Sequence, residues 1–199
     1  MSLLAILLFA GTVGLSLWAT MRVRQVYSEF SQLPASSGLT GAETAAKILR
    51  QEGIHDVQIV ELEQALGDHY DPIHKRDYAP LQWRMASVGL TTFASQVVLW
   101  LPLLGIFTGF VNTAMALILV ATAWGILMLF NLITLPVEFD ASSRARLVLR
   151  DTGLIRTPEE DNAVTQLLRA AAWTYVAAFI TSLAYFLLHL LPLLSGRKE

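Results

Sequence analysis

The 199-residue sequence contains no cysteine and only 14 basic and 16 acidic side chains, which together make up 15% of the chain. The missing thiols exclude disulfide frameworks, thiolate zinc sites and cysteine nucleophiles. Soluble globular domains usually carry about 25% charged residues, so a single water-soluble domain is not expected. A hydrophobic fraction of 54% excludes disorder, which requires low hydrophobicity. With a net charge of −2, the chain also lacks the basic surface of a nucleic-acid-binding protein.

Charged residues are absent from three stretches, 1–21, 85–137 and 170–196, which are 21, 53 and 27 residues long. Crossing about 30 Å of hydrocarbon takes about 20 helical residues. The first stretch predicts an anchor helix over 1–21 rather than a cleaved signal peptide, because no basic residue precedes Leu3. The 53-residue stretch 85–137 fits two helices in a hairpin, over 86–105 and 114–135, and the last predicts a helix over 170–194. The expected fold is mainly α: a polytopic membrane protein with about four transmembrane helices and a small cytoplasmic α(+β) layer.

The basic residues predict the orientation of the chain. Four spans place segments 22–84 and 138–169 on one side of the membrane, and both termini, with the tail 195–199, on the other. Lys and Arg number 12 in the two segments and 2 in the tail. Because basic residues concentrate on the cytoplasmic side, both segments should face the cytoplasm from a bacterial inner (plasma) membrane, with the lipid bilayer as the first partner.

The polar segments show local signals for secondary structure. Thr40 and Glu43 form a capping box that opens a helix over 40–52, and Gly53 ends it. Residues 56–62 alternate apolar and polar side chains, which predicts a short strand, and a polar His-Tyr-Asp-Pro loop follows at 69–72. The segment 138–169 is expected to be helical to about Arg150, to turn at Gly153, and to start a second capped helix at 157–160.

Two groups of residues are candidates for chemistry. His69 and His74 lie in one loop with two aspartates, and they could bind a divalent metal or simply belong to a capped turn. Glu138 and Asp140 lie where the third span leaves the membrane. Glu138 could be a carboxylate ligand at the mouth of the bundle, or both acids could stabilise a helix, with Asp140 pairing with Arg144.

A third group lies within the last span. Ser182, Tyr185 and His189 share one helix face by their spacing. Interhelical hydrogen bonding and a proton-relay role for His189 are the two interpretations of this face.

Four motifs occur in a characteristic order: Ser-Gly-Leu-Thr-Gly-Ala-Glu at 37–43, Asp-His-Tyr-Asp-Pro at 68–72, Tyr-Ala-Pro-Leu at 78–81 and Leu-Pro-Val-Glu-Phe-Asp-Ala-Ser at 135–142. Over nearly the whole chain this order resembles the YugP-type neutral zinc metallopeptidases of bacterial membranes. The resemblance implies a zinc cofactor and peptide-bond hydrolysis. It also implies that Glu138 occupies the position of the third zinc ligand, with Asp140 as its nearby support.

One part of that family pattern is missing from the sequence. In the family, a His-Glu-x-Gly-His helix follows the His-Tyr-Asp-Pro loop and supplies two zinc ligands and the general base. Here Lys75-Arg76-Asp77 leads directly into Tyr78, so a block of about thirty residues is absent together with that motif. A catalytic zinc site normally uses three protein ligands, and His69 and His74 are the residues that could replace the missing histidines.

The sequence therefore predicts a pseudoenzyme of this family, with zinc absent or weakly bound. It would serve as a binding or assembly module for a membrane or cytoplasmic protein partner. An active metallopeptidase is the alternative, if the missing block belongs to the natural protein or if a substitute metal site operates. A transporter or channel subunit is a weaker alternative, because no charged residue lies well inside a predicted span.

Overall fold

The computed structural model describes residues 3–55, 58–59, 79–108 and 113–194. These residues form five helices: α1 (Leu3–Phe30), α2 (Gly41–Gln51), α3 (Ala79–Thr108), α4 (Thr113–Asp151) and α5 (Pro158–Leu194). Four of them, all except α2, are long and apolar enough to cross a membrane, which confirms the expected number of spans.

The expected α(+β) layer is not supported, because the described residues contain no strand. Of the predicted strand 56–62, only Gln58 and Ile59 are described, and neither is in a strand; the other five residues lie outside the described part. The described polar layer consists of α2, the loop before it and the charged ends of the long helices. Apolar alternation over a few residues is a weak signal, since it does not require a neighbouring strand to pair with.

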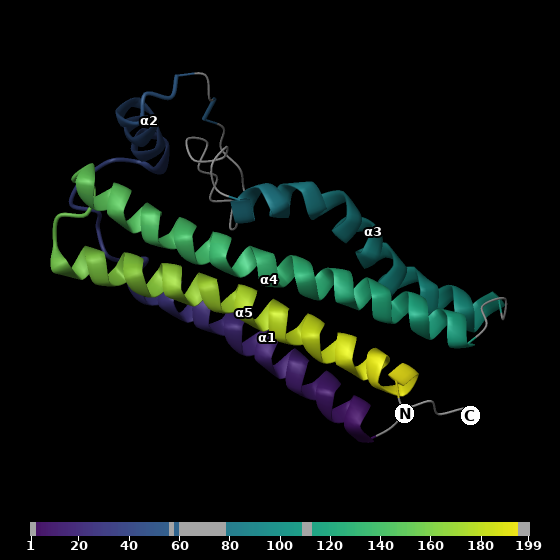
Figure 1. Ribbon diagram of the computed structural model, residues 1–199. Helices are drawn as coiled ribbons and strands as arrows, with labels where there is room; N and C mark the ends of the chain where they lie inside the picture. Colours follow the sequence, from purple (N-terminus) through teal and green to yellow (C-terminus); the bar gives the residue numbers. More distant parts are fainter. Residues whose placement is uncertain (1–2, 56–57, 60–78, 109–112, 195–199) are drawn as a thin grey trace.

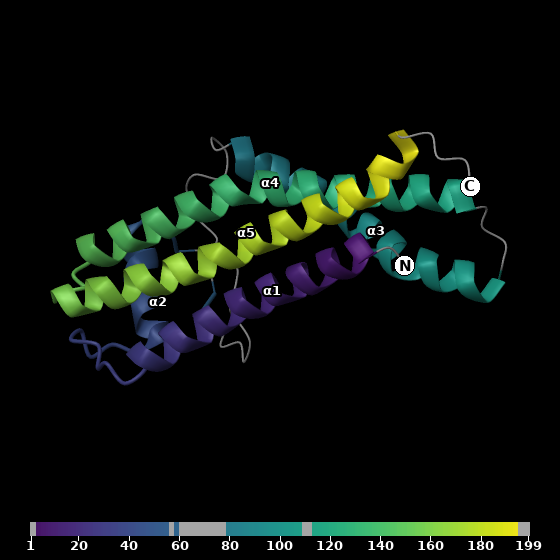
Figure 2. The ribbon, with the colours of Figure 1, turned by 90° about the horizontal axis from the view of Figure 1, so that it is seen from below.

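The four long helices follow the order α3, α4, α5, α1 in Figure 1, and each neighbouring pair runs antiparallel; Figure 2 shows α4, α5 and α1 side by side, with α3 behind them. The main contacts follow this order, from α3 to α4, from α4 to α5 and from α5 to α1. The helices thus form an open row, with α4 and α5 in its middle. The short helix α2 lies at the end of the row where α4 ends and α5 begins (Figure 1).

Close packing and polar contacts join α4 to α5. The rings of Trp124 and Tyr185 are stacked with their centroids 4.7 Å apart. At the next residue of each helix, Phe186 lies so close to Gly125 that a Cβ added to Gly125 would be 3.0 Å from the ring. Further along, Asn131 donates a hydrogen bond from Nδ2 to Ser182 Oγ over 3.0 Å. A small residue and an interhelical hydrogen bond are the features that hold transmembrane helices together.

The helices extend beyond the predicted spans. α1 continues past Arg22 and Arg24 to Phe30, and α4 continues through Pro136 to Asp151 as one helix of 39 residues. Charged residues mark where a chain leaves hydrocarbon, but they do not end a helix, because the backbone hydrogen bonds are the same in water. The charge pattern therefore predicted the number of membrane-length helices but not where those helices end.

The capping signals were predicted correctly. Thr40 Oγ1 accepts a hydrogen bond from Glu43 N over 3.3 Å, and Glu43 Oε2 accepts one from Thr40 N over 2.8 Å. Gly53 and Gly153 have φ angles of 68° and 64°, the left-handed conformation that ends α2 and α4. Lys47 then joins the two helices by donating a hydrogen bond to the carbonyl of Thr152 over 2.6 Å, which places α2 over the end of α4.

Candidate functional site

Glu138, the residue in the predicted third-ligand position, is buried and bonded to an arginine. It lies on α4 directly after the charge-free stretch and is only 5% exposed. Arg84 on α3 donates a hydrogen bond from Nη1 to Glu138 Oε1 over 2.9 Å, and the two groups form an ion pair. One oxygen of the carboxylate is thus held by a cation of the neighbouring helix.

The meeting of Arg84 and Glu138 follows from the hairpin. The two residues are the last charge before stretch 85–137 and the first charge after it. Because α3 and α4 run antiparallel, residues that flank the hairpin at its two open ends come to the same level. Sequence reasoning found Glu138 but missed its partner, although this flanking position was a signal that could have identified it.

The other predicted metal residues do not surround Glu138 in the described part of the chain. Asp140 Oδ2 accepts a hydrogen bond from Arg144 Nε over 2.7 Å. This is the helix-stabilising pair that the spacing of the two residues predicted. His69 and His74 lie outside the described residues. Within residues 3–55, 58–59, 79–108 and 113–194, no three His, Cys, Asp or Glu residues lie close enough together to hold a metal ion. The described residues therefore do not fit a catalytic zinc site, which needs three protein ligands.

A second buried carboxylate, Glu160, lies at the charged start of α5, ahead of the charge-free stretch of that helix. It closes the predicted capping box with Thr157 and also accepts hydrogen bonds from the backbone N–H groups of Ser36 and Arg156, over 2.7 and 2.8 Å. The hydroxyl of Ser36 donates a further bond over 2.9 Å. These donors, with the Ser36 N–H first, lower the pKa of Glu160 to about 2. Glu160 therefore fixes the loop after α1 to the start of α5, a contact that sequence reasoning missed.

The neighbouring Asp161 joins α5 to the end of α4. It accepts hydrogen bonds from Arg146 Nη2 over 2.6 Å and from Arg150 Nη2 over 2.7 Å. Arg146 Nε donates a third over 2.9 Å. The bonds from Arg146 are the main reason that the pKa of Asp161 is lowered to about 2. Both acids at this helix start are thus ionised at neutral pH and engaged in contacts between elements.

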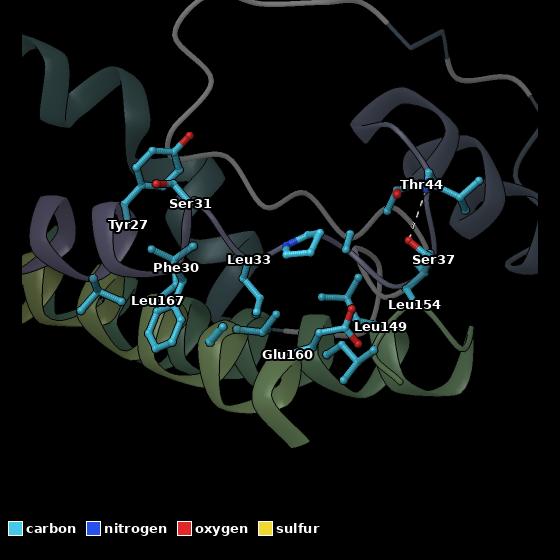
Figure 3. Close-up of a pocket in the computed structure, with 17 residues that line it drawn as sticks. Tyr27, Phe30, Ser31, Leu33, Ser37, Thr44, Leu149, Leu154, Glu160 and Leu167 are labelled. Carbon is cyan, nitrogen blue, oxygen red and sulfur yellow. Dashed lines mark hydrogen bonds between the residues drawn. The ribbon is translucent and has the colours of Figure 1, made fainter. Parts of the chain in front are cut away.

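A cavity of about 300 Å³ lies beside Glu160, between the end of α1, the loop 31–39, α2 and the facing ends of α4 and α5 (Figure 3). Apolar side chains form most of its wall, among them Phe30, Leu33, Leu154 and Leu167. The cavity and the Glu138–Arg84 pair both lie on the side of the molecule that carries the charged segments. Figure 3 shows that residues far apart in the sequence meet at this cavity.

The polar face of α5 packs mainly within the row of helices. Ser182 is 2% exposed and bonds to Asn131, and Tyr185 stacks on Trp124. The Nδ1 atom of His189 lies 2.7 Å from the carbonyl of Tyr185, one turn back on the same helix. The hydrogen-bonding interpretation of this face is thus supported for Ser182, and the relay role of His189 stays a prediction.

Four membrane-length helices with a buried carboxylate–guanidinium pair at their charged end define the chain as a polytopic helical membrane protein. The sequence profile of the family described as "Putative neutral zinc metallopeptidase" matches residues 5–76 and 73–194. The chain belongs to this family. A relative in Bacillus subtilis (strain 168), named "Putative membrane protease YugP", is 37% identical over 229 residues, which cover 99% of this chain and 100% of the relative. No solved structure matches the chain.

The two matches also show a difference in length and a junction in the family match. The alignment with the Bacillus protein spans 229 positions and this chain has 199 residues, so at least 30 positions of the alignment contain no residue of this chain. The family profile matches in two parts that meet at 73–76. This is the place where the sequence lacks the expected His-Glu-x-Gly-His helix.

Proposed function

We propose that this protein is a member of the zinc metallopeptidase family that does not hydrolyse peptide bonds and acts as a binding or assembly module in a bacterial inner membrane. Its polar segments face the cytoplasm, and its partner is a membrane or cytoplasmic protein. The observation that carries this proposal is the state of Glu138, whose carboxylate is held by Arg84 and belongs to no group of three potential metal ligands among the described residues.

The chemistry of zinc hydrolysis supports the proposal. A metallopeptidase of this type needs two histidines one helical turn apart and a glutamate between them that deprotonates the metal-bound water. The four histidines of this sequence are His55, His69, His74 and His189, and no two of them are separated by four positions with a glutamate next to the first. One carboxylate cannot replace this set.

Zinc content tests the proposal directly. The protein purified in detergent should contain well under one zinc per chain, and Glu138→Ala should leave the zinc content and the absence of hydrolysis of a fluorogenic peptide unchanged. Glu159→Ala, which removes an exposed carboxylate from the start of α5, is the matched control. Stoichiometric zinc that is lost in Glu138→Ala but kept in Glu159→Ala, together with peptide hydrolysis, would show that the active-peptidase alternative is correct.

The proposed orientation has an independent test, because the chain contains no cysteine. A single cysteine introduced by Asp151→Cys lies at the exposed end of α4. In intact cells a membrane-impermeant thiol reagent should not label it, and permeabilised cells should label it fully. Labelling in intact cells would place the charged segments outside the cytoplasm.

A further inference from the structure

A second cavity of about 300 Å³ lies between α1 and α5, and its lining shares no residue with the cavity beside Glu160. Its wall consists of Trp18, Arg22, Gln166, Arg169, Ala170 and Trp173. Arg22 is the first charged residue of the chain, and Arg169 is the last charge before the final charge-free stretch. The cavity therefore lies where both helices pass from apolar to charged sequence.

The two helices contribute the same pair of residues in opposite directions. On α1, Trp18 precedes Arg22 by four positions, and on α5, Arg169 precedes Trp173 by four positions. Residues four apart lie one above the other on a helix face, and the two helices run antiparallel side by side (Figure 2). Both arginines are thus on the charged side of the cavity, and both tryptophans are on its apolar side. The tryptophan rings meet edge to face with centroids 5.8 Å apart.

The positive charge of this cavity has no counter-charge within the described part of the chain. The one hydrogen bond that Arg22 makes there is to Gln25 Oε1, over 3.4 Å, and Arg169 makes no ion pair or hydrogen bond with the described residues. By contrast, Arg146 and Arg150, near the end of α4, are both paired with the carboxylate of Asp161 on α5. Two guanidinium groups at one cavity attract an anion, and the planar donors of arginine match the oxygens of a phosphate.

We propose that this cavity binds the phosphodiester headgroup of an anionic phospholipid in the leaflet next to the charged segments. Arg22 and Arg169 hold the phosphate, and Trp18 and Trp173 contact the glycerol and the first part of the acyl chains. Basic pockets between transmembrane helices bind such headgroups, and tryptophan belongs at this depth of a bilayer. A lipid is favoured over free phosphate because three of the six lining residues are Trp18, Ala170 and Trp173, whose surfaces are mainly apolar and suit the glycerol and acyl chains. The proposal does not depend on zinc or on hydrolysis.

Titration of the detergent-purified protein with phosphatidylglycerol, followed by native mass spectrometry, tests this site. Removing one arginine by Arg22→Gln or Arg169→Gln should weaken binding of the first phosphatidylglycerol about fivefold, since each basic residue near an anionic surface contributes roughly that factor. Arg22→Lys and Arg169→Lys keep the charge and should fall between the wild type and the Gln variants. Phosphatidylcholine should bind far more weakly, and millimolar inorganic phosphate should not displace the lipid.

The matched control is Arg24→Gln, which removes the same charge from an exposed position two residues away on α1, outside the cavity. It should change the affinity less than twofold. An effect as large as that of Arg22→Gln would mean that the general positive charge of α1, and not this cavity, attracts the lipid. That result would overturn the proposal. Equal binding of phosphatidylcholine, or displacement of the lipid by inorganic phosphate, would overturn the lipid assignment. All variants change exposed or half-exposed side chains, so folding, checked by circular dichroism and gel filtration, should be retained.

Discussion

The ion pair between Arg84 and Glu138 makes a measurable prediction about coupling between α3 and α4. The side chains are 22% and 6% exposed, and they share one contact of 2.9 Å. Exposed ion pairs contribute about 0–1 kcal/mol, whereas removing one partner of a fully buried pair costs about 3–5 kcal/mol. A single charge-assisted hydrogen bond with one buried and one partly exposed partner should therefore have a coupling energy of about 1.5–2 kcal/mol.

A double-mutant cycle measures this energy with Arg84→Gln, Glu138→Gln and the two changes combined. Unfolding by sodium dodecyl sulfate in mixed micelles, followed by tryptophan fluorescence, gives the free energy of unfolding for each variant. The cycle isolates the pair from any other contact of Arg84, because such contacts cancel between the single and double variants.

The second ion pair of α4 provides the control. Asp140 and Arg144 are spaced i, i+4, and their side chains are both 36% exposed, so their cycle should give only about 0.3–0.5 kcal/mol. Because Glu138 is buried, the coupling energy of Arg84 and Glu138 should be clearly larger than that of Asp140 and Arg144. If the two cycles give the same energy, the buried pair does not hold the hairpin together, and the reasoning about the Glu138 site is wrong.

Three further predictions concern other parts of the molecule. The pKa of Glu160 is lowered to about 2 from an ordinary 4.5. The ionised carboxylate therefore stabilises the fold fully above pH 4.5, and this stabilisation is lost as the pH falls from 4.5 towards 2. Glu160→Gln should flatten the pH profile of thermal unfolding in that range. Gly125→Leu should destabilise the protein by about 1–3 kcal/mol, because the side chain would meet a phenyl ring of α5, whereas Gly89→Leu, with no atom within 4 Å, should change little. Inserting the unmatched segment of the Bacillus relative at 73–76 should create a chain that binds about one zinc, measured by metal analysis, and Glu138→Ala should remove it.

The sequence predicted best what composition and local spacing determine. The number of spans follows from uncharged length, and the capping boxes at Thr40 and Thr157 follow from residues only three positions apart. Glu138 was identified by its motif, and its role as a ligand stays a prediction. What it bonds to in the fold was not predicted, because Arg84 is 54 positions away and no local pattern links the two.

The same reason explains the other residues that were missed. Ser36 bonds to Glu160 across 124 positions, so this contact exists only after α1 and α5 have packed together. The strand predicted at 56–62 rested on local alternation alone; Gln58 and Ile59 are not in a strand, and the other five residues lie outside the described part of the chain. Long-range polar contacts thus depend on the order of helices in the row, which hydropathy does not encode.

The unbroken course of α4 through Pro136 has a mechanical consequence. A helix of 39 residues is about 58 Å long, nearly twice the roughly 30 Å of hydrocarbon that it crosses. The part of α4 after the charge-free stretch, residues 138–151, is therefore about 21 Å long, and a tilt of about 10° would move its tip by roughly 4 Å. Tilt is the usual response of a long helix to bilayer thickness. A change in bilayer thickness should therefore displace the end of α4 and, with it, the cavity beside Glu160.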